Sequence, residues 1–166
     1  MGTGTFSVGG TTLQGATAAA ARNCDITVST GTLTFSGNYT KDGTGSDLTS
    51  SGAATVFFGG NVTNTRGTSF NLTGSTTTFT ATGLITPTIA VTFGTAVVNS
   101  GVTTSVNSGT STFGKLFVDG TASIGGATLI ANDTTSVNGT LNITSVTCTK
   151  TFIGNISINS GGIWNN

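Results

Sequence analysis

One short segment of the chain carries two carboxylates that are close enough in sequence to bind a cation together. Asp42 and Asp47 flank the turn-forming sequence Gly-Thr-Gly-Ser. Calcium takes carboxylate and backbone carbonyl oxygens as ligands, and a glycine-rich turn can direct its carbonyls toward an ion. We therefore name Asp42 and Asp47 as a candidate Ca²⁺ site. A solvated turn that holds no ion is the alternative.

Few other residues could do chemistry, and this excludes several classes of protein. The chain has no His and no Glu, so its general acid/base groups are limited to five scattered Asp. An imidazole metal site is excluded for the same reason. No Gly-rich stretch has the spacing of a phosphate-binding loop, and no nucleophile lies near a base. We expect a protein that is not an enzyme, with no catalytic and no cofactor-binding residues.

Charge and hydropathy restrict the partners of the chain. Its ten charged residues give a net charge of zero over 166 residues. Five Lys and Arg are too few for the basic patch that nucleic acid requires. The apolar runs fall short of the roughly 18–20 residues that a membrane-spanning helix needs. We therefore expect no nucleic-acid partner and no membrane insertion.

A threonine alternation suggests a binding surface. Thr76, Thr78, Thr80 and Thr82 share one phase of a strand, and Phe79 falls on the other. Flat Thr arrays on a solenoid face are how some antifreeze proteins engage ice. The same row is also an ordinary solvated strand face, and the motif does not recur in register along the sequence. Binding of ice or glycan is therefore an alternative function.

Short strands must carry these residues. Thr, Gly, Ser and Asn make up 96 of the 166 residues, and Val, Ile and Phe recur between them. Apolar and polar residues alternate in several segments, as in a strand with one buried face. These segments are residues 24–28, 33–35, 89–93, 146–148 and 156–158. The one candidate helix is residues 15–22, which contain an alanine run too short to be stable alone.

A drifting repeat indicates how the strands are arranged. Residues 34–40 align with residues 57–63, and residues 136–141 form a looser third copy. Phe58 and Phe79 recur at a similar spacing, and so do Phe113 and Val137. Strands and Gly or Asn corners that recur in this way are typical of a β-solenoid. We predict a single all-β domain over residues 1–166, a parallel β-helix of about seven coils of about 21–24 residues.

Such a fold allows a polar chain to bury a core. Each coil points a few side chains inward, and neighbouring coils stack them in rows that backbone hydrogen bonds hold together. The expected core anchors are Phe35, Phe58, Phe79 and Phe113. At about 4.8 Å per coil the rod would be roughly 35 Å long. A β-sandwich or jelly roll uses the same alternation and is the alternative fold.

The two cysteines test the choice between these folds. In a solenoid, Cys24 and Cys148 would lie about five coils, or roughly 25 Å, apart. A disulfide needs Cα atoms within about 7 Å, so we predict no bridge within the chain. Both residues fall on the apolar phase of their segments, which predicts buried free thiols. A bridge between them would instead favour the sandwich.

The repeat units resemble a known kind of sequence. Residues 31–39, 137–143 and 160–166 are similar to the Thr-, Gly- and Asn-rich repeats of very large cell-surface proteins of Bacteroidota. Those proteins are often exported by the type IX secretion system and serve as adhesins. The resemblance implies an extracellular, cell-surface adhesin segment, and it transfers no functional residue to this chain.

Both ends of the chain have the pattern of open strands. Residues 2–6 are already strand-like, and residues 161–166 stop as another strand opens. We expect an excerpt of a longer repetitive chain, a non-enzymatic structural or adhesive rod segment whose partners are neighbouring repeats of the same polypeptide. A subunit that stacks on copies of itself in an extracellular filament is the alternative. Surface glycans are a further candidate partner.

Overall fold

Among the residues that the structure describes, short segments rich in Thr and β-branched residues form twenty β-strands, in agreement with their preference for extended backbone. The computed structural model describes residues 4–15, 24–66 and 69–166, and these contain no helix. The predicted helix at residues 15–22 lies outside the described residues, Gly15 excepted. The strand pairs are parallel, and each joins a strand to the one a coil away.

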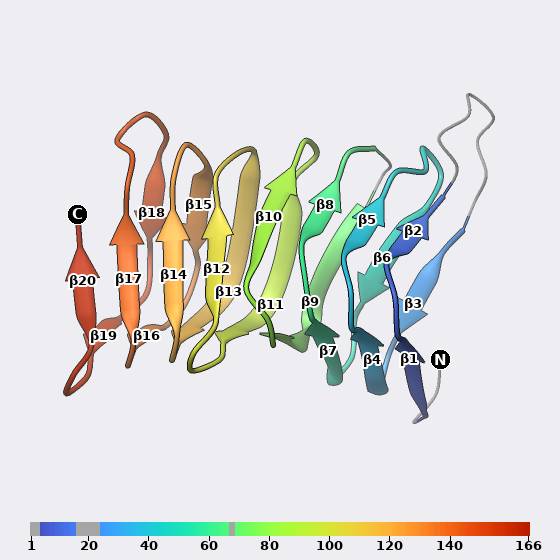
Figure 1. Ribbon diagram of the computed structural model, residues 1–166, viewed down its shortest axis with the longest axis horizontal. Coiled ribbons are helices and arrows are strands. Elements are labelled where there is room, and N and C mark those ends of the chain that lie inside the picture. Colours follow the sequence, from blue (N-terminus) through green and yellow to red (C-terminus); the bar gives the residue numbers. More distant parts are fainter. Residues whose placement is uncertain (1–3, 16–23, 67–68) are drawn as a thin grey trace.

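Three ladders of strands run along the long axis of the molecule (Figure 1). Ladder one is an eight-stranded sheet. Its strands are β2 (Thr12–Gln14), β5 (Tyr39–Lys41), β8 (Val62–Asn64), β10 (Gly83–Pro87), β12 (Thr103–Val106), β14 (Thr121–Ile124), β17 (Thr140–Ile143) and β20 (Ile163–Asn165).

Ladders two and three belong to one twelve-stranded sheet, because three long strands run through both. These are β9 (Ser69–Phe79), β11 (Val91–Val98) and β13 (Thr110–Val118). The other strands of ladder two are β1 (Thr5–Val8), β4 (Gly31–Phe35), β7 (Ala54–Phe58), β16 (Thr135–Val137) and β19 (Ile156–Ile158). The other strands of ladder three are β3 (Ile26–Val28), β6 (Asp47–Ser50), β15 (Thr128–Ala131) and β18 (Lys150–Phe152).

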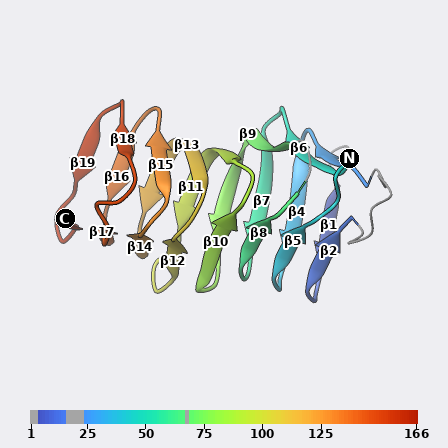
Figure 2. The ribbon, with the colours of Figure 1, turned by 90° about the horizontal axis from the view of Figure 1, so that it is seen from above.

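The chain visits the ladders in a fixed order. It passes from ladder two to ladder one, then to ladder three, and then returns to ladder two one coil further on. Figure 2 shows the coils side by side along the long axis, with the two termini at opposite ends. The predicted parallel β-solenoid of about seven turns is therefore confirmed, and the sandwich alternative is wrong.

Stacked aromatic rings fill the interior. Phe35, Phe58 and Phe79 are register partners in ladder two, and the rings of Phe35 and Phe58 stack with centroids 5.4 Å apart. In ladder three, Phe93 stacks on Phe113 at 5.3 Å. Phe79 meets Phe93 edge to face at 5.7 Å, which joins the two stacks. All four predicted anchors are buried, as expected.

The coil length varies more than the sequence predicts. The coil that separates the register partners Thr103 and Thr121 is among the shortest, and the coil that separates Thr5 from Thr32 is among the longest. Only the strands must stay in register, so the corners can absorb the difference. The predicted repeat from Phe113 to Val137 is wrong, because Phe113 pairs with Ala131 in ladder three and Val137 belongs to ladder two.

The strand predicted at residues 146–148 is also wrong. These residues lie in the corner between β17 and β18, and the side chain of Val146 is almost fully exposed. Alternation over so few residues is the same in a loop as in a strand. Only pairing with a neighbouring coil distinguishes the two.

Side-chain amides stack the corners as the backbone stacks the strands. The backbone N–H of Asn61 donates to Asn38 Oδ1 one coil away, at 2.9 Å. The backbone N–H of Leu84 donates to Asn61 Oδ1 in the same way, also at 2.9 Å. At another corner, Asn138 Nδ2 donates to Asp119 Oδ1 at 2.6 Å. These bonds explain the abundance of Asn, which satisfies corner groups that the strands do not pair.

Phe57 and Phe58 form a matched pair for testing which side chains of β7 face the core. Phe58 is fully buried, whereas Phe57 faces outward and is partly exposed. We expect F58A to lower the free energy of unfolding by about 3–5 kcal/mol, because it leaves a cavity in the aromatic stack. We expect F57A to change it by about 1 kcal/mol or less. Urea unfolding followed by circular dichroism measures both, and equal losses would contradict the assigned faces.

Thr77 tests the cost of a polar residue in the core. Its side chain is buried between register partners Val56 and Ala96, and its hydroxyl has no hydrogen-bond partner among the described residues. We expect T77V to raise the free energy of unfolding by about 1 kcal/mol or more, because it removes an unpaired buried hydroxyl. The outward control T76V should change it by less than about 0.5 kcal/mol. Destabilisation by T77V in the same urea experiment would show that this hydroxyl has a partner.

Candidate functional site

Charged side chains gather at one corner of the rod. The structure describes nine of the ten charged residues, and five lie where ladder one turns into ladder three in the first three coils: Asp25, Lys41, Asp42, Asp47 and Arg66. We call these five residues the charged corner. The Arg66 Nε atom lies 3.5 Å from Asp42 Oδ1, and the backbone N–H of Asp47 donates to Asp25 Oδ1 at 3.0 Å. The coil winding thus brings together residues spread over a long stretch of sequence.

An inward polar row lies beside the charged corner. Gln14, Lys41 and Asn64 are register partners at the ends of β2, β5 and β8, and all three are buried. Each donates to a backbone carbonyl at the corner: Gln14 to Asp47 at 2.7 Å, Lys41 to Arg66 at 2.9 Å, and Asn64 to Ile89 at 3.0 Å. Because buried carbonyls need donors, this row stabilises the corners.

Lys41 is the charged member of this row, and it is fully buried. Burial lowers the pKa of its ammonium group below the ordinary value, and the nearby carboxylates of Asp47 and Asp25 oppose part of that shift. Burial also raises the pKa of the Tyr39 phenol, which donates a hydrogen bond to Gln14 Oε1. An amine with a lowered pKa is more often neutral, and a neutral amine is a nucleophile.

Lys41 and Asn64 are not among the residues predicted from the sequence, although the sequence contains a signal for them. The repeat that aligns residues 34–40 with residues 57–63 places Lys41 on Asn64 when the alignment is extended by a single position. Both lie where apolar residues are expected in a buried strand. A polar pair at matching inward positions of two coils is therefore the pattern that could have revealed them.

The predicted calcium ligands face other partners. Asp42 Oδ1 accepts a hydrogen bond from the Thr65 hydroxyl, in addition to its contact with Arg66. Asp47 belongs to β6, whose register it helps to set by pairing with Ser69. Within the described ranges, no group of three or more His, Cys, Asp or Glu is placed to hold a metal ion. Calcium binding at Asp42 and Asp47 stays a prediction.

The cysteines lie at opposite ends of the rod and are both free thiols. Cys24 precedes β3 in the first coil, and Cys148 precedes β18 in the last. The prediction that both are buried is wrong, since Cys24 is exposed and Cys148 is partly exposed. The physical reason is that each lies in a corner just before a strand, where the alternation of faces has not yet begun.

Thiol labelling tests this placement. We expect iodoacetamide to modify Cys24 in the folded protein faster than Cys148, whose thiol donates to the Gly126 carbonyl at 2.8 Å. Mass spectrometry of the single-cysteine variants C148S and C24S gives each rate, and the unfolded chains in urea provide the reference. Equal protection of both thiols would be inconsistent with these positions.

The predicted threonine alternation is shorter in the structure than in the sequence. Thr76 and Thr78 face outward from β9, whereas Thr80 and Thr82 lie beyond its end. A threonine column does recur in register, however, on five successive coils of ladder two: Thr5, Thr32, Thr55, Thr76 and Thr95. Variable coil lengths hide this column in the sequence.

The column beside it is mixed. Two residues further along each strand stand Ser7, Thr34, Phe57, Thr78 and Val97. A Thr-X-Thr pair therefore occurs on ladder two only at β4 and β9 among these coils. The outward surface of ladder two over these five coils is therefore a single threonine column flanked by a column of mixed side chains.

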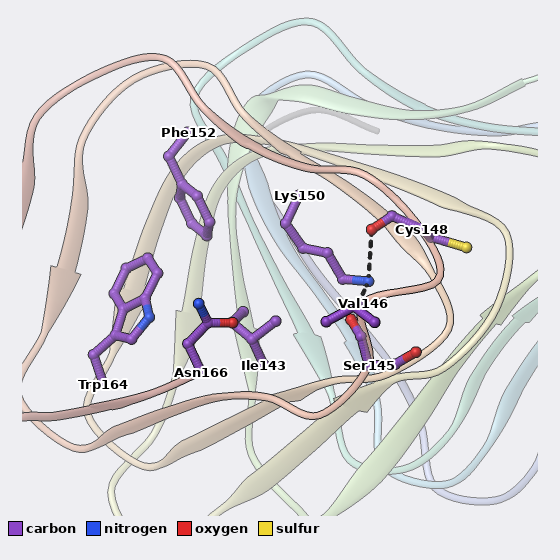
Figure 3. Close-up of a pocket in the computed structure, with 8 residues that line it drawn as sticks. All are labelled: Ile143, Ser145, Val146, Cys148, Lys150, Phe152, Trp164 and Asn166. Carbon is purple, nitrogen blue, oxygen red and sulfur yellow. Dashed lines mark hydrogen bonds between the residues drawn. The ribbon is translucent and has the colours of Figure 1, made fainter.

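A cavity of about 270 Å³ opens at the C-terminal end of the rod (Figure 3). Phe152 and Trp164 line it with ring centroids 5.1 Å apart, and Lys150 Nζ donates to the carbonyls of Ser145 and Cys148. A second cavity, of about 440 Å³, lies at the opposite end and is lined by Phe6, Asp25, Ile26 and Thr27. Each cavity lies against the terminal strand of ladder three, which has seven strands where the other ladders have eight.

These features define the class of the protein as a parallel β-solenoid. Comparison with protein-family models, with curated proteins and with solved structures found no match. Among the residues with described positions, no helix is long and apolar enough to cross a membrane.

Proposed function

We propose that the chain is a non-enzymatic segment of an extracellular rod, a shaft that extends and stiffens a bacterial surface adhesin. The observation that carries this proposal is the set of three parallel ladders along the whole long axis. A force that pulls two coils apart along the rod must break backbone hydrogen bonds in all three ladders at once. With ten charged residues in 166, the rod responds little to salt or pH.

The repeat sequences support the cell-surface location. Their Thr-, Gly- and Asn-rich units resemble those of large Bacteroidota surface proteins, and the structure gives the units a shared role as strands and corners. Outward threonines and corner amides leave a neutral, hydroxyl-rich surface. Such a surface suits a spacer between a cell and its target, with surface glycans as a candidate contact.

The end coils support partners that continue the stack. Phe6 and Ile158 occupy inward positions, yet each is 45% exposed. Their register partners one coil inside the rod, Leu33 and Val137, are fully buried. Burying such side chains contributes about 25 cal/mol per Å² of apolar surface, so a further coil at either end is favourable.

We favour the adhesin shaft over the filament subunit, because the repeat units resemble those of very large cell-surface proteins.

Electron microscopy and small-angle X-ray scattering of the purified 166-residue chain distinguish the two. We expect single rods roughly 35 Å long over a wide range of concentration. Long fibres with a regular axial repeat would overturn the shaft in favour of the filament subunit.

Two variants identify the surface that any fibre uses. Ile158→Lys places a charge at an inward position of the last coil, whereas the control Ser157→Lys places it outward from the same strand. Fibres that persist in S157K and disappear in I158K would locate the contact at the coil end. Rods that remain single in all three proteins support the shaft.

A further inference from the structure

Lys41 and Asn64 are a buried polar pair, and each donates to a corner carbonyl. They are register partners in the neighbouring strands β5 and β8, which lie about 4.8 Å apart. Both side chains face the interior, with Lys41 fully buried and Asn64 only 1% exposed. In the next coil of the same row stands Pro87, whose side chain is apolar.

The amine of Lys41 reaches into the coil that contains Asn64. Its Nζ atom donates to the carbonyl of Arg66, which follows Asn64 closely in the chain, at 2.9 Å. The Asn64 Nδ2 atom donates to the carbonyl of Ile89, but Asn64 Oδ1 has no hydrogen-bond partner among the described residues. A buried amine therefore lies in the same coil as a buried amide whose carbonyl oxygen is unpaired.

The surroundings fit a reaction between these two groups. Burial lowers the pKa of Lys41 and so favours the neutral, nucleophilic amine. The carboxylates of Asp47 and Asp25 act electrostatically on Lys41 and oppose part of this shift. Exclusion of water protects the amide from competing hydrolysis.

We propose that Lys41 and Asn64 join in an intramolecular amide cross-link between the second and third coils. The Nζ lone pair of neutral Lys41 adds to Asn64 Cγ and forms the new C–N bond. One proton passes from Nζ to Nδ2. The Cγ–Nδ2 bond then breaks, and ammonia leaves. No oxidant or reductant is needed, and the chain loses one ammonia.

The product fits the same space. Its amide N–H can keep the bond to the Arg66 carbonyl. The reaction also replaces an amine whose charged form is costly to desolvate with a neutral amide. A covalent tie between coils would suit a rod under tension, but the proposal does not depend on the rod function, and its test is independent of rod shape.

Tryptic mapping of the unfolded wild-type chain tests the proposal directly. Trypsin cleaves after Lys and Arg, so an unmodified chain yields residues 23–41 and residues 42–66 as separate peptides. The cross-link blocks cleavage at Lys41. We expect one looped peptide over residues 23–66, lighter by one ammonia than the sequence mass, with fragmentation that locates the bond between Lys41 and Asn64.

Two other maps would overturn it. Separate peptides of unmodified mass mean that no reaction occurs. A peptide over residues 42–66 that lacks ammonia, with normal cleavage after Lys41, means that Asn64 has cyclised on its own backbone instead.

Variants then assign the roles. We expect K41M and N64A to abolish the looped peptide, because each removes one of the two reacting groups. The control K115M replaces a lysine far along the rod, in β13, and should leave the looped peptide unchanged. Because the wild-type map decides the question alone, a variant that fails to fold does not prevent the test.

Discussion

The structure depends on one constraint, the parallel register between successive coils. Each strand between the two end coils pairs with a strand in the coil before and in the coil after, at a spacing of about 4.8 Å. Once register is fixed, a side chain has its counterparts one coil away as its nearest neighbours on the same face. Phe35, Phe58 and Phe79 form a stack for this reason, although they are far apart in the sequence. The same constraint aligns the outward threonines and the corner amides.

The interior shows how a chain with few large apolar residues can still close a core. Aromatic stacks fill ladders two and three in the central coils, and aliphatic residues such as Val106 and Ile124 fill ladder one. Several inward positions hold small hydroxyl residues instead, and some of their oxygens, as in Ser111 and Thr135, have no partner among the described residues. The backbone ladders supply enough order to tolerate these losses.

The charged corner differs from the rest of the rod. Elsewhere charged side chains are few, and corners are held by side chains such as Asn138 and Asp119 or by backbone turns such as that at Gly109. There φ is +67°, and an added Cβ would lie 1.8 Å from the Pro87 carbonyl oxygen. At the charged corner, three inward polar side chains hold the corner carbonyls, and one of them is a buried lysine. The charged corner therefore gives the first three coils a group of neighbouring charges, including the buried Lys41 amine.

Local sequence determined much of the architecture. Alternating residues specified strands at residues 33–35 and 156–158, Gly and Asn marked corners, and the spacing between Phe35 and Phe58 gave the coil. These features are local because one coil is short, and strand faces follow from alternation alone. The absence of His and Glu likewise follows from composition.

The tertiary structure decided which residues of different coils become neighbours, because this depends on register. Corners of different length change the number of residues in a coil, so sequence spacing linked Phe113 to Val137 in the wrong ladder. Variable corners also hid the threonine column, and alternation placed Cys24 and Cys148 inside when both lie in corners. The stacked strands showed that the repeat continues through Lys41 and Asn64 and that both side chains are buried. A corner can gain or lose residues without cost to the ladders, and sequence distance therefore does not fix which residues meet.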